Sequence, residues 1–435
     1  MVKKFVIISL ILFMFGSCKF FSDFFNKQDQ IKSTYNLSVV WELQTERYFS
    51  NRNYLKIDNY LYFDESDEDY NDVADYTFCI SKVDLDTGRY VWKTNRINAC
   101  MTGWDSVKKI QDYIFVLAYR GKIYVYSDID GSLVTTVFLG NTDEEKKIFT
   151  NSESSVTYND FLIWDVFTND GIYLDDGIVL LDVNNIDMTQ KEQILVPTYI
   201  WRRNEEDKHC VSNFMIEKDG ILYFQTYARD GLWSFIYALD LGKNEILWKQ
   251  NTNGLKGTGQ NCLTILNDNL YSIEYGLGKY DIKNGAPIIE LNYEEIDCCN
   301  TICLAGHSTV GGITYSGGYF YYTTSSSPGG NIVGTPRELI KNIFCIRPSD
   351  FKIVWCDLDY KTGSLYSKVV VENNKAFVFG EDRIRVYNAA TGKLLGINDE
   401  VGTWVFENAT NYNGNVIFFN TDRKTKTSVL TAIKA

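Results

Sequence analysis

A short signature recurs eight times along the chain, and no other feature of the sequence constrains the fold as strongly. Each copy has a turn residue, one spacer, an apolar residue and then an aromatic or aliphatic residue. The copies begin at Asn59, Asp112, Asp160, Gly220, Asp268, Gly318, Asn374 and Gly414. Successive copies start 40 to 60 residues apart, with a mean of about 51. A period of that length is typical of folds that stack one supersecondary unit many times.

A second signature lies between successive copies of the first. Its clearest copy runs from Asp84 to Trp92, and weaker copies occupy 128–133, 239–248, 281–285, 347–355 and 388–394. The Asp, Asn and Gly residues in these copies let the chain reverse where φ must be positive. The flanking residues alternate in polarity, as in strands with one buried face. Each repeat therefore supplies about four strands, which is the content of one propeller blade.

Tryptophan spacing supports the same period. Trp92 follows Trp41 by 51 residues, Trp248 follows after 156 and Trp355 after a further 107, or about one, three and two periods. Trp41 precedes the first complete repeat, whereas the last segment, 415–435, contains inner strands without an outer one. We therefore predict an eight-bladed β-propeller of four-stranded antiparallel blades, with the ring closed by N- and C-terminal strands that share a blade.

The composition agrees with this all-β fold. Tyr, Phe and Trp make up 15% of the residues, and proline occurs only five times. Aromatic enrichment suits the half-buried surfaces of sheets. The predicted propeller domain spans residues 37–435. The formal net charge of −13 disfavours nucleic acid as a partner, because binding it requires a basic surface that neutralises phosphates.

The amino terminus has the layout of a secretory signal peptide. Lys3-Lys4 forms a basic region, residues 5–15 form an apolar run, and Gly16-Ser17 precedes Cys18. The apolar run is shorter than the roughly 20 residues that a membrane-spanning helix needs. The layout resembles the signal of bacterial lipoproteins, which implies removal of residues 1–17 and attachment of lipid, such as palmitate, to Cys18.

Residues 18–36 are interpreted as a lipidated tether between the membrane and the folded domain. Lys19 follows the cysteine, and the absence of Asp there resembles lipoproteins sorted to the outer membrane. We therefore expect a protein of the bacterial cell envelope that contacts the membrane through its lipid alone.

The run from Asp86 to Trp92, with echoes at 240–248 and 391–395, resembles the PQQ-like (quinoprotein-type) propeller repeat. The resemblance covers roughly residues 37–435. The family that it implies contains quinone-dependent dehydrogenases as well as non-catalytic propellers. Among the latter are BamB-like lipoproteins, which assist the assembly of outer-membrane β-barrels.

Cys298-Cys299 is the feature that argues for a quinone site, because the dehydrogenases of this family resemble chains with adjacent cysteines beside the cofactor. Against it, about 51 residues per repeat leave little length for insertions that enclose a cofactor. The Ca²⁺-ligand and catalytic motifs of the family are not matched either. We therefore predict no catalytic residue, no cofactor and no metal, with a PQQ-dependent dehydrogenase as the less favoured alternative.

Cys298, Cys299, Cys303 and His307 also have the residue types of a zinc site. Adjacent cysteines make tetrahedral chelation awkward, and export favours oxidation of neighbouring thiols. A disulfide, reduced thiols and, least favoured, a metal therefore stay open for these residues.

Two further expectations concern cysteine and histidine. Cys345 and Cys356 flank a hairpin and could face each other as a disulfide. His209 and His307 are the only histidines and lie far apart in the sequence, which argues against a histidine-based triad or a multi-histidine metal centre.

Two segments are expected to form surface loops. The acidic run 64–72 only faintly resembles a calcium loop, so we interpret it as a solvated connection between strands. The connection at 200–212 carries Trp201, Arg202 and Arg203, which are candidate partner-binding or ligand-binding residues because propeller loops commonly carry such contacts.

The favoured function is therefore a non-catalytic, lipid-anchored scaffold that binds envelope or outer-membrane proteins through propeller-face loops, with a role in outer-membrane protein assembly as one form of it. A carbohydrate or small-ligand receptor is the first alternative. It would use exposed aromatic side chains, for which Trp104, Trp164, Trp201 and Trp233 are candidates. Ordinary packing between blades is the favoured explanation of those four residues.

Overall fold

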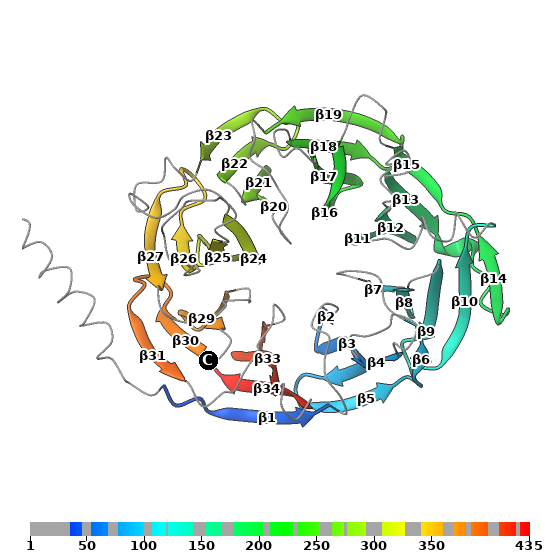
Figure 1. Cartoon of the computed structure of the whole chain (residues 1–435), viewed down its shortest axis with the longest axis horizontal. Coiled ribbons are helices and arrows are strands. Elements are labelled where there is room, and N and C mark those ends of the chain that lie inside the picture. Colours follow the sequence, from blue (N-terminus) through cyan, green and yellow to red (C-terminus); the bar gives the residue numbers. More distant parts are fainter. Residues whose placement is uncertain are drawn as a thin grey trace, which may run out of the picture.

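The computed structural model contains eight β-sheets arranged in a ring (Figure 1), which confirms the predicted eight-bladed propeller. The structure describes residues 35–45, 54–67, 77–99, 106–118, 121–141, 154–166, 177–202, 209–228, 234–252, 263–273, 276–292, 307–326, 341–359, 369–379, 384–398, 409–422 and 427–435. Within these ranges the only helix is the 3-10 turn η3 (Val183–Asn185), so none could cross a bilayer.

Each blade is numbered by its order in the chain, and its strands run outward from the centre. Blade 1 contains β2 (Tyr54–Ile57), β3 (Tyr60–Asp67), β4 (Thr77–Asp84) and β5 (Arg89–Lys93), with β6 (Ile97–Asn98) beside β4. Blade 2 contains β7 (Val107–Ile110), β8 (Tyr113–Ala118), β9 (Lys122–Ser127), β10 (Leu133–Leu139) and β14 (Glu192–Leu195). Blade 3 contains β11 (Ser155–Tyr158), β12 (Phe161–Val166), β13 (Gly177–Asp182) and β15 (Thr198–Arg202). Blade 4 contains β16 (His209–Lys218), β17 (Ile221–Ala228), β18 (Ser234–Asp240) and β19 (Glu245–Asn251).

The second half of the ring has the same design. Blade 5 contains β20 (Leu263–Leu266), β21 (Asn269–Ile273), β22 (Gly276–Asp281) and β23 (Pro287–Asn292). Blade 6 contains β24 (His307–Ser316), β25 (Tyr319–Ser326), β26 (Lys341–Ile346) and β27 (Ile353–Asp359). Blade 7 contains β28 (Val370–Glu372), β29 (Lys375–Phe379), β30 (Ile384–Asn388) and β31 (Leu394–Asn398). Blade 8 contains β32 (Thr410–Tyr412), β33 (Asn415–Asp422), β34 (Thr427–Lys434) and β1 (Val39–Gln44).

Blade 8 closes the ring as the tryptophan spacing predicts. The N-terminal strand β1 pairs antiparallel with the C-terminal strand β34, and Trp41 lies opposite Ala432. Because β1 is the outermost strand of this blade, the two ends of the chain are joined by a full hydrogen-bonded ladder.

A β-bulge occurs between the third and fourth strands of every blade. In blade 1, Lys82 lies opposite Trp92 and Val83 opposite Tyr90, so Val91 is the extra residue. A bulge changes the direction in which the next side chain points. Here it precedes Trp92, whose indole Nε1–H donates to the carbonyl of Asp128 in the third-to-fourth-strand turn of blade 2, at 2.8 Å.

The same contact joins three other pairs of blades. Trp41 donates to the carbonyl of Leu85, Trp248 to that of Ile282 and Trp355 to that of Ala389, at 3.2, 3.1 and 2.7 Å. The turn glycine of the accepting blade lies against the indole. At Gly392, with φ of +67°, a Cβ atom would lie 2.5 Å from the ring of Trp355.

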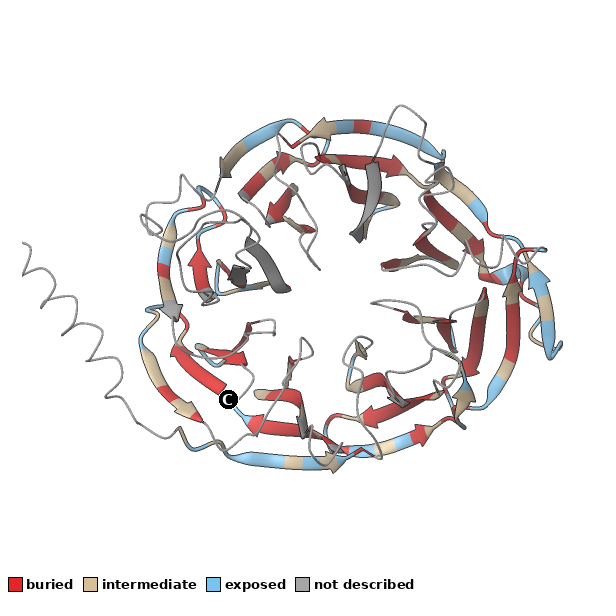
Figure 2. Cartoon of the chain, viewed as in Figure 1, coloured by how far each residue is buried: buried red, intermediate tan, exposed pale blue. Residues whose placement is uncertain are grey.

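The core is divided among the seams between blades, and each of the eight seams contains one cluster of buried apolar side chains. Figure 2 shows the burial concentrated on the inner strands and the exposure on the outermost ones. Radial stacking buries both faces of each sheet, so a single blade would lack a core of its own.

Two expectations were wrong. Cys345 lies opposite Trp355 and Cys356 opposite Phe344, so the two cysteines point to opposite faces of blade 6 and form no disulfide with each other. The start of the acidic run is also not a solvated loop, because Asp64 and Glu65 lie within β3 and are buried. The rest of that run, 68–72, lies outside the described residues.

Substitution of Gly392 by alanine should lower the free energy of unfolding by about 2–4 kcal/mol, because it adds a clash with Trp355 to the cost of a positive φ. Gly317 is a matched control, since its φ is +58° and no atom within 4 Å would meet a Cβ there. Urea unfolding of both variants separates the two costs. Equal losses for Gly392→Ala and Gly317→Ala would show that the indole contact adds nothing.

Candidate functional site

Strand direction sorts the connections of the propeller into two ends. The turns between first and second strands are tight and of two residues, as at Asp58-Asn59. The turns between third and fourth strands lie at the same end, here named the tight-turn end; only in blade 3 is this connection long, because residues 183–197 contain η3 and β14. The connections between second and third strands, and those from one blade to the next, lie at the opposite end. We name that end the long-connection end, because the ends of β23 and β24 and those of β25 and β26 meet there with 14 residues of chain between each pair.

Four of the predicted site residues fall in connections whose flanking strands are joined at the long-connection end. Arg203 lies between β15 and β16, and Cys298, Cys299 and Cys303 lie between β23 and β24. These four residues, like Cys18, lie outside the described residues, so their predicted roles stay predictions.

Trp201 and Arg202 are described and differ in their surroundings. The indole of Trp201 packs edge-on against Phe224 and Tyr237 of blade 4, with ring centroids 5.3 and 5.8 Å apart. It therefore fills the seam between blades 3 and 4. Arg202 is exposed at the end of β15, and its guanidinium lies 3.8 Å from the centre of the Tyr199 ring. The Tyr199 ring therefore holds the exposed Arg202 guanidinium in place at the long-connection end.

The seam position of Trp201 could have been found in the sequence, because Trp201 follows Trp92 by 109 residues, or about two periods. For Trp164, packing between blades was the favoured explanation, and it is confirmed. Trp164 is fully buried in the cluster between blades 2 and 3. Trp104 and Trp233 lie outside the described residues.

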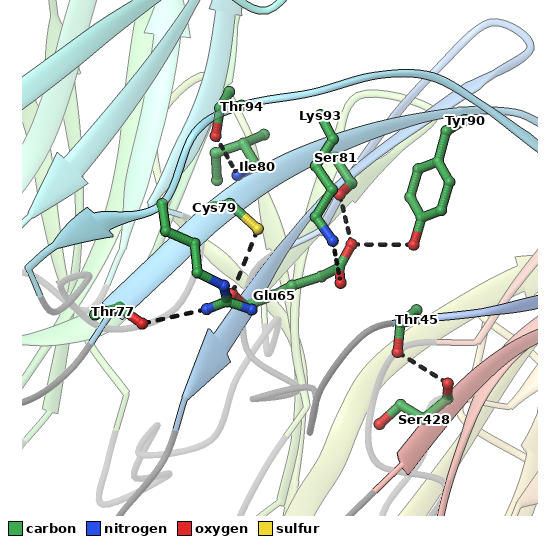
Figure 3. Close-up of polar contacts among 11 residues, drawn as sticks. Thr45, Glu65, Thr77, Cys79, Ile80, Ser81, Tyr90, Lys93, Thr94 and Ser428 are labelled. Atoms are coloured by element: carbon green, nitrogen blue, oxygen red, sulfur yellow. Dashed lines mark hydrogen bonds and ion pairs between the residues drawn. The ribbon is translucent and has the colours of Figure 1, made fainter.

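A buried carboxylate lies near the long-connection end of blade 1 (Figure 3). Glu65 accepts hydrogen bonds from the hydroxyls of Ser81 at 2.6 Å and Tyr90 at 3.1 Å, and it pairs with the Lys93 ammonium at 2.8 Å. Its side chain has no exposed surface. The three partners come from β4 and β5, so the carboxylate ties three strands together where β3 enters the acidic connection.

Neighbouring contacts secure the same region. Arg96 donates to the carbonyl of Glu65 at 3.4 Å and to the hydroxyl of Thr77 at 3.2 Å. On blade 8, the hydroxyl and the backbone N–H of Thr45 both donate to the carbonyl of Ser428, at 2.8 and 2.9 Å. The described contacts of Glu65 pair its charge with Lys93 and bury it. We therefore interpret this carboxylate as a structural anchor rather than as a general base.

A second charged network lies in the seam between blades 1 and 2, at the tight-turn end. The carboxylate of Asp128 pairs with Lys82 at 2.8 Å and with Lys109, and it accepts a hydrogen bond from Tyr62 at 2.8 Å. Burial favours the protonated form of Asp128, but the hydrogen bonds from Lys109, Lys82 and Tyr62 outweigh burial and lower its pKa. Burial and the bond to Asp128 raise the pKa of the Tyr62 phenol, so this group stays a donor.

A cavity of about 270 Å³ opens among the inner strands of blades 6, 7 and 8. It is lined by Ile313, Thr314, Tyr315, Ser316, Val369, Val370, Val371, Ala409, Thr410 and Asn411. The Thr314 hydroxyl donates to the carbonyl of Val369, and the Asn411 amide donates to Glu372 at 2.6 Å. Five of the ten lining residues are aliphatic, the others have hydroxyl or amide groups, and the donors of Thr314 and Asn411 already bond within the protein.

This cavity does not fit the quinone cofactor that the family resemblance raises. PQQ carries three carboxylates, which need cationic or uncommitted donors around them. None of the lining residues is cationic. Among the described residues there is also no group of three His, Cys, Asp or Glu side chains placed to hold a metal ion. His209 and His307 begin β16 and β24, on two different blades.

Replacement of Asp128 by asparagine should destabilise the protein at pH 7 by about 3 kcal/mol, because two partly buried ammonium groups lose their counter-charge. The folded pKa of Asp128 is below the unfolded value near 3.9. Its stabilisation is therefore complete above that pH and is lost as the pH falls through the folded pKa. Asp128→Asn should accordingly flatten the acid side of the stability profile.

Chemical unfolding from pH 7 to pH 2 measures this effect. Asp130→Asn is the control for the loss of counter-charge, because Asp130 belongs to the same turn and its described partners, Ser127 and Ser132, carry no charge. A wild-type unfolding midpoint for Asp128→Asn at pH 7 would contradict the role given to the network.

Comparisons with known proteins agree on the fold. No protein-family model and no curated protein matches the sequence. The crystal structure of BamB from Moraxella catarrhalis is 16% identical with a TM-score of 0.56, and the match covers 92% of this chain and 98% of that one. The quinohemoprotein alcohol dehydrogenase of Comamonas testosteroni is 13% identical with a TM-score of 0.62, covering 91% and 76%. A europium-containing methanol dehydrogenase is 10% identical with a TM-score of 0.57, covering 93% and 94%. The chain therefore has the eight-bladed propeller fold of BamB and the quinoprotein dehydrogenases, as its repeats predicted.

Proposed function

We propose that the chain is a non-catalytic scaffold of the bacterial cell envelope that binds other envelope proteins through its long-connection end. A role in the assembly of outer-membrane proteins is the form of this function that the similarity to BamB favours. The signal-like N-terminus and Cys18 support attachment to the membrane by lipid.

The observation that carries the proposal is that the bonds between blades and the long connections lie at opposite ends of the propeller. The tight-turn end supplies the carbonyls of Leu85, Asp128, Ile282 and Ala389 that hold the blades together. Apart from residues 183–197 of blade 3, the long connections join strand ends at the other end, where Arg202 is exposed. Binding surfaces commonly lie on loops that a rigid scaffold positions. The long-connection end thus has long connections that a rigid ring of blades supports.

A small-ligand or carbohydrate receptor is the second candidate. It is supported by the cavity among blades 6, 7 and 8, which is roughly large enough for a small ligand. It is less favoured because Trp164 and Trp201, two of the aromatic residues that could have bound a sugar, pack between blades.

Arg202→Glu should lower the amount of partner protein recovered with the chain by about tenfold, because arginine at an interface often contributes 1–2 kcal/mol or more. Affinity purification of the full-length protein from intact membranes, with quantitative mass spectrometry, measures this ratio. Arg347→Glu is the matched control, since Arg347 is also exposed but lies at the tight-turn end. Recovery of no specific partner, or equal losses for both variants, would overturn the proposal.

Cys18→Ser should move the protein from the membrane fraction to the soluble fraction and abolish incorporation of labelled palmitate. Lipid is the only membrane contact that we propose, and its loss removes about 0.8 kcal/mol per buried methylene. Fractionation and metabolic labelling of cells that express either form test this directly. Membrane retention of Cys18→Ser with an uncleaved N-terminus would instead indicate an anchor formed by the peptide.

A further inference from the structure

The outer rim of a propeller consists of sheet edges, and an unprotected edge can pair with another strand. In this chain the outermost strands of seven blades are β1, β5, β15, β19, β23, β27 and β31. Each of them joins its blade through a β-bulge. Bulges twist and interrupt an edge, which is one way in which proteins prevent pairing between edges.

Blade 2 is the exception among the described blades. Its fourth strand β10 has the bulge, at Leu133/Thr135, but β14 from the next repeat covers it. Strand β14 pairs parallel with β10 in an uninterrupted register, from Thr136 opposite Glu192 to Leu139 opposite Leu195. The connection between β13 and β15 therefore replaces a bulged edge with a regular one, which Figure 1 shows at the outer rim of the ring.

The backbone of β14 presents open hydrogen-bonding groups to the outside. The carbonyls of Lys191 and Leu195 accept hydrogen bonds from β10. Because backbone groups alternate along a strand, Glu192, Ile194 and Val196 direct their N–H and C=O groups away from β10. No strand of the described residues lies beyond β14. The side chains of Ile194 and Val196 are 59% and 49% exposed.

Strand β14 is short, with four residues, but a bulge and an outward proline do not protect its edge. Of the three outward residues, only Glu192 is charged and none is proline. Pro197 has the same strand parity as Leu195, so its missing N–H falls on the side of β10 rather than on the open side.

The sequence of β14 is complementary to itself. In an antiparallel pair of two copies centred on Ile194, this residue faces its counterpart, Glu192 faces Val196 and Gln193 faces Leu195. No like charges meet, and all three outward residues exchange main-chain hydrogen bonds. Such an interface is isologous, with the same patch contributed by both copies.

We propose that two copies of this chain associate through antiparallel pairing of β14 with β14, which joins their second blades into one continuous sheet. Antiparallel pairing reverses the strand direction between the copies.

The test uses charge at the two-fold position. Ile194→Lys and Ile194→Glu should each weaken the dimer about tenfold, because the apolar contact is lost and two like charges face each other. An equimolar mixture of the two variants should restore association, since Lys then faces Glu. Sedimentation equilibrium of the full-length protein and of the variants, alone and mixed, measures the dissociation constants.

Two control variants separate this proposal from a general effect of surface charge. Val354→Lys adds the same charge to another exposed residue of an outermost strand, β27, and should leave the dissociation constant unchanged. Glu192→Lys should also be tolerated, because residue 192 faces Val196 and not itself. Circular dichroism confirms that each variant is folded.

A wild-type chain that remains monomeric at high micromolar concentration would overturn the proposal. Dimerisation that neither single Ile194 variant weakens, or weakening that the mixture does not reverse, would overturn it as well. These results are independent of whether Arg202 binds a partner.

Discussion

The hydrogen bond from a tryptophan indole to a turn carbonyl of the next blade is the interaction on which this ring depends. Trp41, Trp92, Trp248 and Trp355 each make it, and each bond spans a seam that the backbone crosses only once. The bulge before each indole aims the ring, and a turn glycine leaves room for it. The bulge, the tryptophan that follows it and the turn glycine of the next blade are thus all needed for one contact.

The remaining seams use other means, which explains why the repeats differ so much in sequence. Between blades 3 and 4, Trp201 packs on Phe224 and Tyr237. Between blades 1 and 2, a carboxylate with two lysines is added to the bond of Trp92. Every seam nevertheless has a cluster of buried apolar side chains. Burial of apolar surface is non-directional, so it tolerates many sequences.

The local parts of this design could be predicted from the sequence, whereas the long-range parts could not. Turn residues and tryptophans repeat with a period, which is why the blade number and the closure at Trp41 could be predicted. The burial of Glu65 depends on Ser81, Tyr90 and Lys93, whose spacing has no motif. The pairing of β14 with β10 joins residues about 56 positions apart in a register that no periodicity encodes. The acidic run 64–72 was interpreted as a solvated loop because the sequence alone does not show which groups pair with the Glu65 carboxylate.

The placement of the acceptor carbonyls bears on how such a ring can acquire a function. All four belong to turns between third and fourth strands, so the contacts that hold neighbouring blades together are concentrated at the tight-turn end. A change in a connection at the opposite end leaves these bonds intact. A propeller can therefore vary one end without losing the ring, which is why proteins with and without catalytic activity share this architecture at identities of 10–16% to this chain. For this chain, the proposed binding at the long-connection end is therefore compatible with the contacts that hold the ring together at the other end.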